Sequence, residues 1–266
     1  MSSVAIIPAR WASTRFPGKP LAILAGKPLV QHVWERCLRA KKIERVIVAT
    51  DDMRIAEAAF EFGAEVAVTS PKHPTGSDRL AEVAAKLRGV ARIVNVQGDE
   101  PMIDPRLVDR LVEDMEANPR AEMVTAATLF ADEAAAGNPN NVKVVTDRLG
   151  NALYFSRSLI PFVRDGIPGS PRPRVSASNP FPLHHLGIYG YRRQFLLQFV
   201  KWKPTPLETA EKLEQLRALE MGARIRVVLT KHRSIGVDTP EDLTAAEAQI
   251  SSPRLRVSVS PRRAST

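Results

Sequence analysis

The sequence contains one cysteine, few aromatic residues and no long apolar run. Cys37 is the single cysteine among 266 residues, which excludes a disulfide framework and a cluster of thiolate metal ligands. The longest apolar runs, such as Val46–Ala49, are far shorter than the roughly 18 to 20 residues of a membrane-spanning helix. A secretion signal is not expected either, because Pro8 and Arg10 interrupt the N-terminal apolar segment. These absences predict a protein of a reducing compartment, most simply the cytoplasm, with no membrane insertion.

The chain is basic, and part of the charge is local. Its net charge is +9, from 38 basic and 29 acidic residues, and segment 251–266 holds four arginines and no acid. A basic body is compatible with anionic small substrates, with nucleic acid or with no specific partner. Because aromatic residues make up 6% of the chain and no known nucleic-acid-reading motif is present, we expect no nucleic-acid partner.

Short apolar runs alternate with amphipathic segments over the first 120 residues. Strands are expected at 4–8, 45–50, 65–69 and 92–96, and helices at 28–42, 51–62, 77–87 and 105–117. Continuous apolar runs separated by helices of this length are typical of βαβ units whose parallel strands are buried on both faces. The first half of the chain therefore predicts an α/β fold with a parallel sheet.

The pattern becomes less regular after residue 122. Strands are expected at 123–129, 142–146, 152–155, 185–191 and 225–230, and helices at 192–200, 206–221 and 240–250. Segment 161–182 contains six prolines and is predicted to form a loop or arm. We expect one domain, residues 1–250 with this proline-rich arm, followed by a basic, disordered Ser/Arg tail at 251–266.

Three cations surround a glycine directly after the first strand. They are Arg10, Arg15 and Lys19, beside Ser13 and Gly18. Ligands of open α/β sheets lie beyond the carboxyl ends of the strands, and three cations at that place suit a polyphosphate. The segment is neither a Walker A loop nor a GxGxxG dinucleotide turn. A basic, solvated loop is the alternative that the spacing leaves open.

Two acidic segments are candidates for a metal site. Asp99 and Glu100 follow the strand at 92–96, where one carboxylate commonly holds Mg²⁺ beside a nucleotide phosphate. Since side chains alternate along a strand, we expect one of the two, Asp99, to face the site. Asp238 precedes a helix that Thr239 caps, and it is free to meet Asp99 over a metal. The alternative is that these acids only form turns and caps.

Three further groups have ordinary structural readings beside the functional ones. Thr75-Gly76-Ser77 suits a base or ribose contact at a helix N-terminus, but also a simple cap. His184 and His185 point to opposite faces of a strand, so they are not a chelating pair. The expected helix 206–221 contains Glu211, Glu214 and Gln215, and it places Glu211 and Gln215 on one face. A polar helix face of this kind is more often exposed to solvent than part of a site.

Six segments together resemble the 3-deoxy-manno-octulosonate cytidylyltransferase (CMP-Kdo synthetase) family, in register from about residue 2 to 250. They are Ile7–Pro20, Asn95–Met102, Leu153–Arg157, His185–Tyr191, Leu213–Arg217 and Gly236–Leu243. The resemblance implies a nucleotide-diphospho-sugar transferase (Rossmann-like) fold, with a mostly parallel mixed central sheet flanked by helices, usually as a homodimer. It also implies the reaction CTP + Kdo → CMP-Kdo + diphosphate, with Mg²⁺, for lipopolysaccharide biosynthesis.

The resemblance also implies roles for individual residues. Lys19, Arg15, Asp99 and Asp238 would be catalytic, with Asp99 and Asp238 as metal ligands. The nucleotide would contact Arg10, Ser13, Arg15, Lys19, Thr75, Gly76, Ser77, Arg79 and Asp99. The sugar acid would contact Gln97, Arg157, His185, Tyr189, Glu214 and Gln215. Trp11 stands where the family commonly has Tyr, and the segment from Ile167 to Pro182 does not match well.

Two other functions remain as alternatives. One is cytidylyl transfer to a related sugar acid, such as 8-amino-Kdo or a sialic acid, which would change the pocket around His185 and Gln215. The other, from a different class, is binding of nucleic acid or an anionic surface through the basic tail. Such binding would weaken steeply with salt and disappear when residues 251–266 are deleted.

Overall fold

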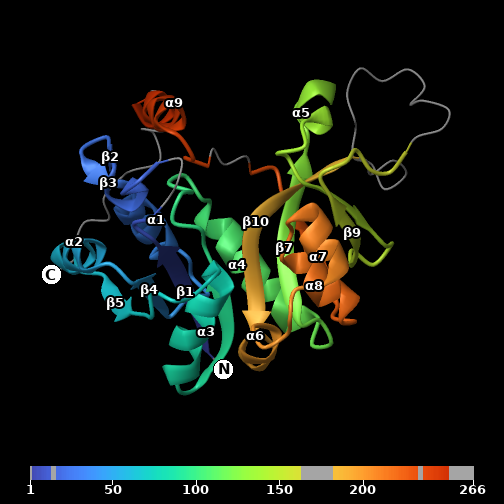
Figure 1. Ribbon diagram of the computed structural model, residues 1–266, viewed down its shortest axis with the longest axis horizontal. Coiled ribbons are helices and arrows are strands. Elements are labelled where there is room, and N and C mark those ends of the chain that lie inside the picture. The colour runs from blue at the N-terminus through green and yellow to red at the C-terminus, as the bar shows by residue number, and fades with distance from the viewer. Residues whose placement is uncertain (1, 13–15, 163–181, 233–235, 252–266) are drawn as a thin grey trace, which may run out of the picture.

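A mixed nine-stranded sheet runs through the part of the chain that the structure describes. The computed structural model describes residues 2–12, 16–162, 182–232 and 236–251. The strand order is β11-β7-β10-β6-β1-β4-β5, and β8 pairs with β10 and β9 beside this path (Figure 1). The strands are β1 (Ser2–Ala9), β4 (Arg45–Thr50), β5 (Glu65–Val68), β6 (Val90–Asn95), β7 (Met123–Leu129), β8 (Lys143–Thr146), β9 (Ala152–Ser156), β10 (Leu183–Arg192) and β11 (Ile225–Leu229). A separate hairpin pairs β2 (Ile23–Leu24) with β3 (Lys27–Pro28).

Strand β10 is the strand in this path that runs against its neighbours. Strands β6, β1, β4 and β5 pair in parallel, as do β7 and β11, whereas β10 pairs antiparallel with both β6 and β7. The carboxyl ends of β1, β4, β6, β7 and β11 therefore meet at one edge of the sheet, the edge where α/β folds bind ligands. The predicted mostly parallel mixed sheet is confirmed.

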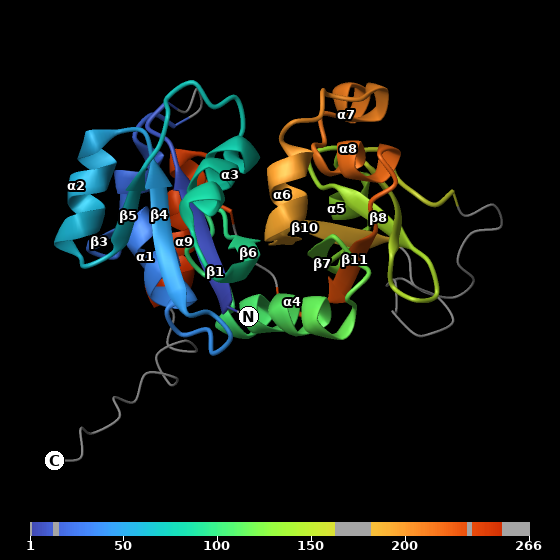
Figure 2. The ribbon, with the colours of Figure 1, turned by 90° about the horizontal axis from the view of Figure 1, so that it is seen from below.

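Helices cover both faces of the sheet, as Figure 2 shows with α4 on one side and α3 and α6 on the other. The helices are α1 (Leu29–Cys37), α2 (Met53–Glu61), α3 (Gly76–Lys86), α4 (Pro105–Ala117), α5 (Glu133–Gly137), α6 (Arg193–Phe199), α7 (Pro206–Glu211), α8 (Gln215–Glu220) and α9 (Pro240–Ser251), with a 3₁₀ turn η1 (Lys19–Leu21). One apolar cluster joins the sheet to α3, α6 and α8, and a second joins it to α1, α2 and α4. The helices in this part of the chain are all too short or too polar to cross a membrane.

The buried strands supply side chains to both clusters in alternation. In β1, Val4 and Ile6 belong to the cluster beneath α3, and Ala5 and Ile7 belong to the cluster beneath α1. All four are completely buried. This is the reason why the sequence shows a continuous apolar run rather than a polar–apolar alternation.

Side-chain caps fix where several helices begin. Asp52, Thr75 and Asp104 each accept a hydrogen bond from a backbone N–H in the first turn of α2, α3 and α4. Pro28, expected to open α1, instead precedes it in an extended conformation, and the helix ends at Cys37 rather than at Lys42, so that prediction was wrong at both ends. Sequence reasoning missed the short β2–β3 hairpin and α5.

The single helix expected at 206–221 is wrong, because the chain breaks it into α7 and α8. Lys212 has φ 55°, a left-handed conformation, and the turn that follows buries Leu213 in the core. Glu211 and Gln215 consequently do not share one helix face. Lysine rarely adopts this conformation, so helical periodicity and composition gave no sign of the break.

Replacing Lys212 by glycine should stabilise the protein by about 1 kcal/mol, because glycine adopts a left-handed conformation without the Cβ clash. Urea unfolding would measure the change. Lys86→Gly, in the right-handed last turn of α3, is the matched control and should destabilise by about 1 kcal/mol. A destabilising effect of glycine at both positions would contradict the left-handed turn.

Three predictions fall on residues outside the described part of the chain. Most of the proline-rich arm, residues 163–181, lies outside it, and so does the basic tail beyond residue 251. Ser13 and Arg15, expected at the nucleotide, also lie outside it.

Candidate active site

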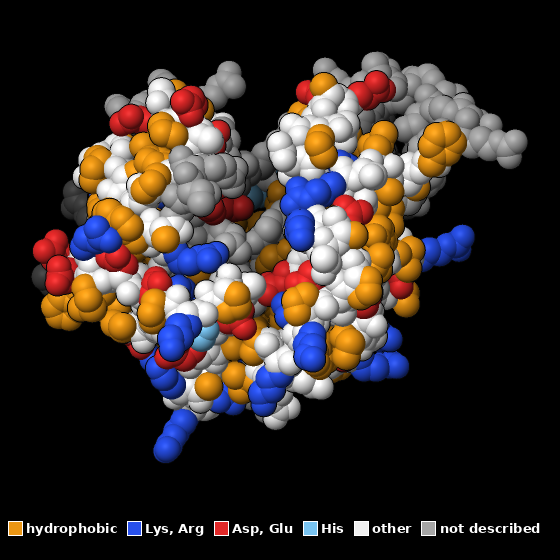
Figure 3. Space-filling view, viewed as in Figure 1, with side chains coloured by type: hydrophobic (Ala, Val, Ile, Leu, Met, Phe, Trp, Pro, Cys, Tyr) orange, Lys and Arg blue, Asp and Glu red, His pale blue; other side chains and the backbone are white. Residues whose placement is uncertain are grey.

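A pocket of about 400 Å³ lies at the carboxyl edge of the sheet, where β1 and β6 end beside α3 and the start of α9. Figure 3 shows this face of the molecule hollowed between the part built on β1, β4 and β5 and the part built on β7 and β9. Nine of the predicted site residues line the pocket: Arg10, Lys19, Gly76, Ser77, Gln97, Asp99, Tyr189, Glu214 and Asp238. Segments far apart in sequence therefore meet at one place.

The loop after β1 folds back on itself through Trp11 and Gly18. The Gly18 N–H donates to the Trp11 carbonyl at 3.0 Å, and Gly18 has φ 71°. A Cβ on Gly18 would lie 3.1 Å from the Trp11 ring, so this position needs glycine. The Arg54 guanidinium lies over the Trp11 ring, 3.4 Å from the ring centroid, as in a cation–π contact. This closure places Lys19 at the start of η1, facing the pocket.

Lys19 joins the two candidate acids. Its Nζ lies 2.7 Å from Asp99 Oδ2 and 3.1 Å from Asp238 Oδ1, and 15% of its side chain is exposed. Residues 219 positions apart thus share one cation. Two carboxylates that converge on a single positive charge form an electrostatic centre in a partly buried pocket.

Backbone contacts hold Asp99 and Asp238 in place. The Val237 N–H donates to the Asp99 carbonyl at 2.8 Å, which ties the two segments together. Asp242, in the first turn of α9, accepts hydrogen bonds from the N–H groups of Asp238 and Thr239. A Cβ on Gly98 would lie 3.0 Å from the Pro8 carbonyl, so glycine there lets the Asp99 turn approach β1 closely.

Asp99 faces the pocket for a different reason from the one expected. Strand β6 ends at Asn95, and Asp99 stands in a turn four residues later, closed by the Glu100 N–H donating to the Gln97 carbonyl. Strand alternation therefore does not apply to Asp99 and Glu100. The correct reason is the turn that Gly98 permits.

Glu214 links the junction of α7 and α8 to the start of α3. Its carboxylate accepts hydrogen bonds from the Ser77 hydroxyl at 2.5 Å and the Thr75 hydroxyl at 3.1 Å. Arg217 donates to the same carboxylate at 2.7 Å. Burial raises the pKa of Glu214, and the Ser77 and Arg217 contacts oppose that rise. Thr75 also caps α3, so its simple structural role is real.

Two predicted ligand residues point away from the pocket. The Arg79 side chain is 1% exposed, lies 3.2 Å from Asp51 and donates to the Thr69 hydroxyl. Arg157 donates through Nε to the Glu211 carbonyl at 2.7 Å and through a terminal nitrogen to the Pro139 carbonyl. Both guanidinium groups brace neighbouring segments in this structure and do not line the pocket.

His185 is a buried neutral histidine. Its Nε2 lies 2.9 Å from the Thr125 hydroxyl, and its ring packs on Phe155 and Tyr189. Burial lowers its pKa to about 3, and the neighbouring His184 adds to that effect. Tyr189 lines the pocket in front of it, with a pKa raised by burial. His185 and the buried Gln215 lie behind the pocket surface rather than on it.

We expect His185 to make folding sensitive to acid. Unfolded histidine binds a proton near pH 6.5, whereas His185 in the folded protein does so near pH 3. Between these values the unfolded state holds more protons, so the free energy of unfolding falls as the pH falls. In His185→Asn this dependence should be shallower by up to about 1.4 kcal/mol per pH unit, measured by urea unfolding. Identical slopes in both proteins would contradict a buried neutral His185.

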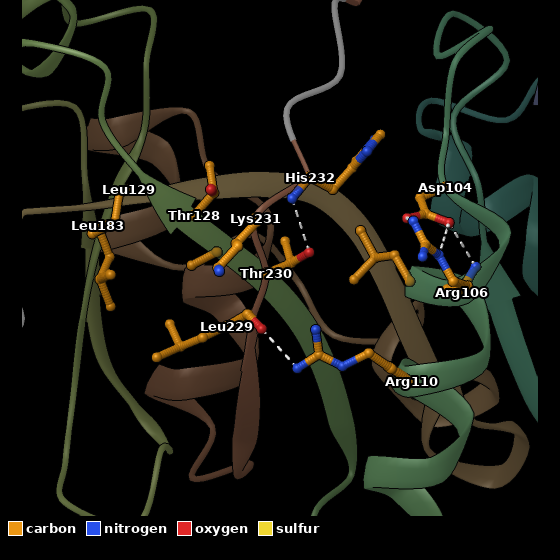
Figure 4. Close-up of a pocket in the computed structure, with 12 residues that line it drawn as sticks. Asp104, Arg106, Arg110, Thr128, Leu129, Leu183, Leu229, Thr230, Lys231 and His232 are labelled. Atoms are coloured by element: carbon orange, nitrogen blue, oxygen red, sulfur yellow. Dashed lines mark hydrogen bonds and ion pairs between the residues drawn. The ribbon is translucent and has the colours of Figure 1, made fainter. Parts of the chain in front are cut away.

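A second hollow, of about 860 Å³, lies between the start of α4 and the ends of β7 and β11 (Figure 4). Two of the cationic side chains that line it already bind protein groups. Arg106 pairs with Asp104, and Arg110 donates to the Leu229 carbonyl at 2.7 Å. None of the motif residues lines it, so size alone does not identify the site.

Comparison with known proteins identifies the family of the chain. A sequence profile of the family described as cytidylyltransferase matches residues 4–225. The chain is 55% identical over 243 residues to a 3-deoxy-manno-octulosonate cytidylyltransferase of Geobacter sulfurreducens, covering 91% of this chain and 97% of that relative. The chain belongs to this cytidylyltransferase family. A relative of the same description from Pseudomonas syringae pv. syringae is 52% identical, covering 90% of this chain and 94% of its own length.

The fold of this cytidylyltransferase matches a solved relative. That structure is described as CMP:2-keto-3-deoxy-manno-octonic acid synthetase complexed with CTP, and it superposes with a TM-score of 0.86 at 40% identity. The match covers 94% of this chain and 99% of the other. The predicted nucleotide-diphospho-sugar transferase architecture is thereby confirmed.

Sequence reasoning missed two features of the site of this cytidylyltransferase. One is the Trp11–Arg54 stack, for which a tryptophan in a basic loop is the available signal. The other is Asn95, which lines the pocket but was not predicted as a site residue. A polar residue at the end of an otherwise apolar strand was the signal that pointed to it.

Proposed function

We propose that the protein transfers the cytidylyl group of CTP to Kdo, releasing diphosphate and forming CMP-Kdo. The observation that carries the proposal is the meeting of Lys19, Asp99 and Asp238 in a pocket whose opposite wall is built by Tyr189 and Glu214. A cationic and acidic centre suits a nucleotide and its metal, and the polar wall suits a sugar. The names of the close relatives support the same pair of substrates.

The nucleotide is held at the end of β1. Arg10 and Lys19 face the pocket and offset the charge of the triphosphate. Pro8, Ala9 and Gly76 also line the pocket, where the N-terminus of α3 offers backbone N–H groups. Ser77 supplies a hydroxyl at the same place.

The residues at the centre fit a magnesium ion. Mg²⁺ in nucleotide sites is bound by one or two carboxylates together with substrate phosphates, and Asp99 and Asp238 provide that pair. The Lys19 ammonium already stands between the two carboxylates as a cation of the chain itself. When bound, magnesium would neutralise phosphate charge and lower the pKa of the attacking hydroxyl.

The reaction needs positioning more than covalent chemistry by the protein. The anomeric oxygen of Kdo forms a bond to the α-phosphorus, the bond from that phosphorus to the diphosphate oxygen breaks, and the hydroxyl proton is released. Lys19 stabilises charge on the departing diphosphate. Gln97, Tyr189 and Glu214 orient the sugar acid from the β10 side. His185 packs on Tyr189 and supports the shape of this wall, whereas Arg157 braces the segments of Glu211 and Pro139. Gln215 is buried beside Glu214 at the start of α8.

The choice of sugar acid is tested by measuring diphosphate release with CTP and Mg²⁺ and each of three acceptors. Kdo should give the highest kcat/KM, followed by 8-amino-Kdo, with sialic acid the poorest. Release with sialic acid alone would overturn the substrate assignment. Release with no acceptor at all would show a hydrolase rather than a transferase.

The remaining parts of the proposal follow from the family resemblance. We propose a homodimer that works in the cytoplasm and supplies activated Kdo for lipopolysaccharide biosynthesis. Sedimentation at several protein concentrations would give the oligomeric state.

A further inference from the structure

Asn95 is a buried polar residue in the wall of the pocket. It is the last residue of β6, and the residue is 3% exposed. It pairs in register with Ile6 of β1 on one side and with Tyr189 of β10 on the other. Ile6 is fully buried in the core, whereas Tyr189 lines the pocket. The open side of Asn95 is therefore the side of Tyr189.

The side-chain oxygen of Asn95 has no hydrogen-bond partner in the described part of the protein. This oxygen, Oδ1, is buried. Buried polar groups are nearly always hydrogen-bonded, and one left alone is costly. Packing does not require an amide here, because Ile93, two residues earlier on the same face of β6, fills the core with an apolar side chain.

We infer that Asn95 binds a hydroxyl group of the sugar acid, and that its amide, whose oxygen is buried and unpartnered beside Gln97 and Tyr189, is a specificity determinant for that hydroxyl. The inference rests on the proposed function and adds a residue to it. A half-turn about χ2 exchanges the two ends of an amide, so Asn95 can present either an acceptor or a donor. A hydroxyl group has both capacities and matches either presentation.

The location of Asn95 favours the sugar acid over the phosphates as its partner. The cations that suit phosphate, Arg10 and Lys19, belong to the loop after β1. Asn95 has no charge to offer a phosphate, and its neighbour toward β1 is the buried Ile6. Gln97 is a second neutral amide in the same pocket, so the two amides form a surface suited to hydroxyl groups.

A site built around such a contact discriminates strongly. When the substrate lacks the hydroxyl, the amide is again left unsatisfied, and the substrate is rejected. Apolar contacts give much weaker discrimination. Asn95 should therefore affect the sugar acid and leave CTP binding unchanged.

Asn95→Leu tests this, because leucine has a similar shape and no hydrogen-bonding group. We expect kcat/KM for Kdo to fall by about 10- to 100-fold, the loss of one buried hydrogen bond. The KM for CTP, and CTP affinity measured by calorimetry without Kdo, should stay within about threefold. Asn140→Leu, at an exposed turn outside the pocket, is the matched control and should change neither constant. Loss of CTP affinity to the same extent as Kdo would overturn the inference.

Monodeoxy analogues of Kdo, each lacking one hydroxyl, identify the contact. For one analogue, the wild type should lose about as much kcat/KM, relative to Kdo, as Asn95→Leu loses with Kdo itself. The kcat/KM of Asn95→Leu should fall little further when that analogue replaces Kdo. Additive losses for every analogue would overturn the inference. If Asn95→Leu does not fold, Asn95→Ser, which is shorter and polar, replaces it in the same comparison. Wild-type protein that releases no diphosphate with Kdo would instead refute the proposed function.

Discussion

Alanine in place of Asp99, or in place of Asp238, should lower kcat for cytidylyl transfer by about 100-fold or more. Each carboxylate accepts a hydrogen bond from Lys19 and belongs to the proposed metal pair. Removing a metal ligand removes several kcal/mol of charge stabilisation in the transition state, and each 1.4 kcal/mol or so is a factor of ten in rate. Diphosphate release at saturating CTP, Kdo and Mg²⁺ would measure the effect.

Glu241→Ala is the control for the Asp238 variant. Glu241 lies three residues away in the first turn of α9, where acidic side chains favour the helix, and it does not line the pocket. We expect a slightly lower melting temperature and an unchanged kcat. If Asp99→Ala or Asp238→Ala retained turnover within threefold of wild type, that residue would not be a metal ligand.

Lys19→Met should have an effect of similar size and a different character. The variant keeps the aliphatic chain and removes the charge, so kcat/KM for CTP should fall by about 100-fold through lost phosphate stabilisation. Lys27→Met, which removes a half-buried lysine paired with Glu35 outside the pocket, is the control and should have little effect.

The same variant gives a second readout in the absence of nucleotide. Lys19 stands between Asp99 and Asp238, so a divalent cation must compete with its ammonium for the acids. Removing that ammonium takes away the cation that both carboxylates contact, and Mn²⁺ should bind nucleotide-free Lys19→Met about tenfold more tightly than wild type. Electron paramagnetic resonance measures free Mn²⁺ directly. Unchanged or weaker Mn²⁺ binding would show that Lys19 and the metal do not share the acid pair.

Strand and helix positions in the first half of the chain were predictable because local signals agreed there. Continuous apolar runs marked the buried strands. Asp52 and Asp104, which cap α2 and α4, stand where the apolar periodicity also predicts the start of a helix. The break at Lys212 had no such signal, because a left-handed lysine is imposed by burying Leu213. Tertiary packing overrode local preference at that point.

The candidate site divides in the same way. The acids and Lys19 converge because the carboxyl ends of parallel strands share one edge, a consequence of topology that a sequence can reveal. The direction of a side chain is harder to predict from a sequence, as Arg79 and Arg157 show. Arg79 turns to Asp51 and Arg157 turns to backbone carbonyls, contacts that depend on neighbours brought close only by folding.

The central claim is that Asp99 and Asp238 hold one divalent ion next to the nucleotide at the end of β1. Crystals of the protein with CTP, a Kdo analogue and Mn²⁺ in place of Mg²⁺ would test it by anomalous diffraction. We predict an anomalous peak within coordination distance of a carboxylate oxygen of each aspartate and of the triphosphate. A peak coordinated by other residues, or by the triphosphate without either aspartate, would contradict the account.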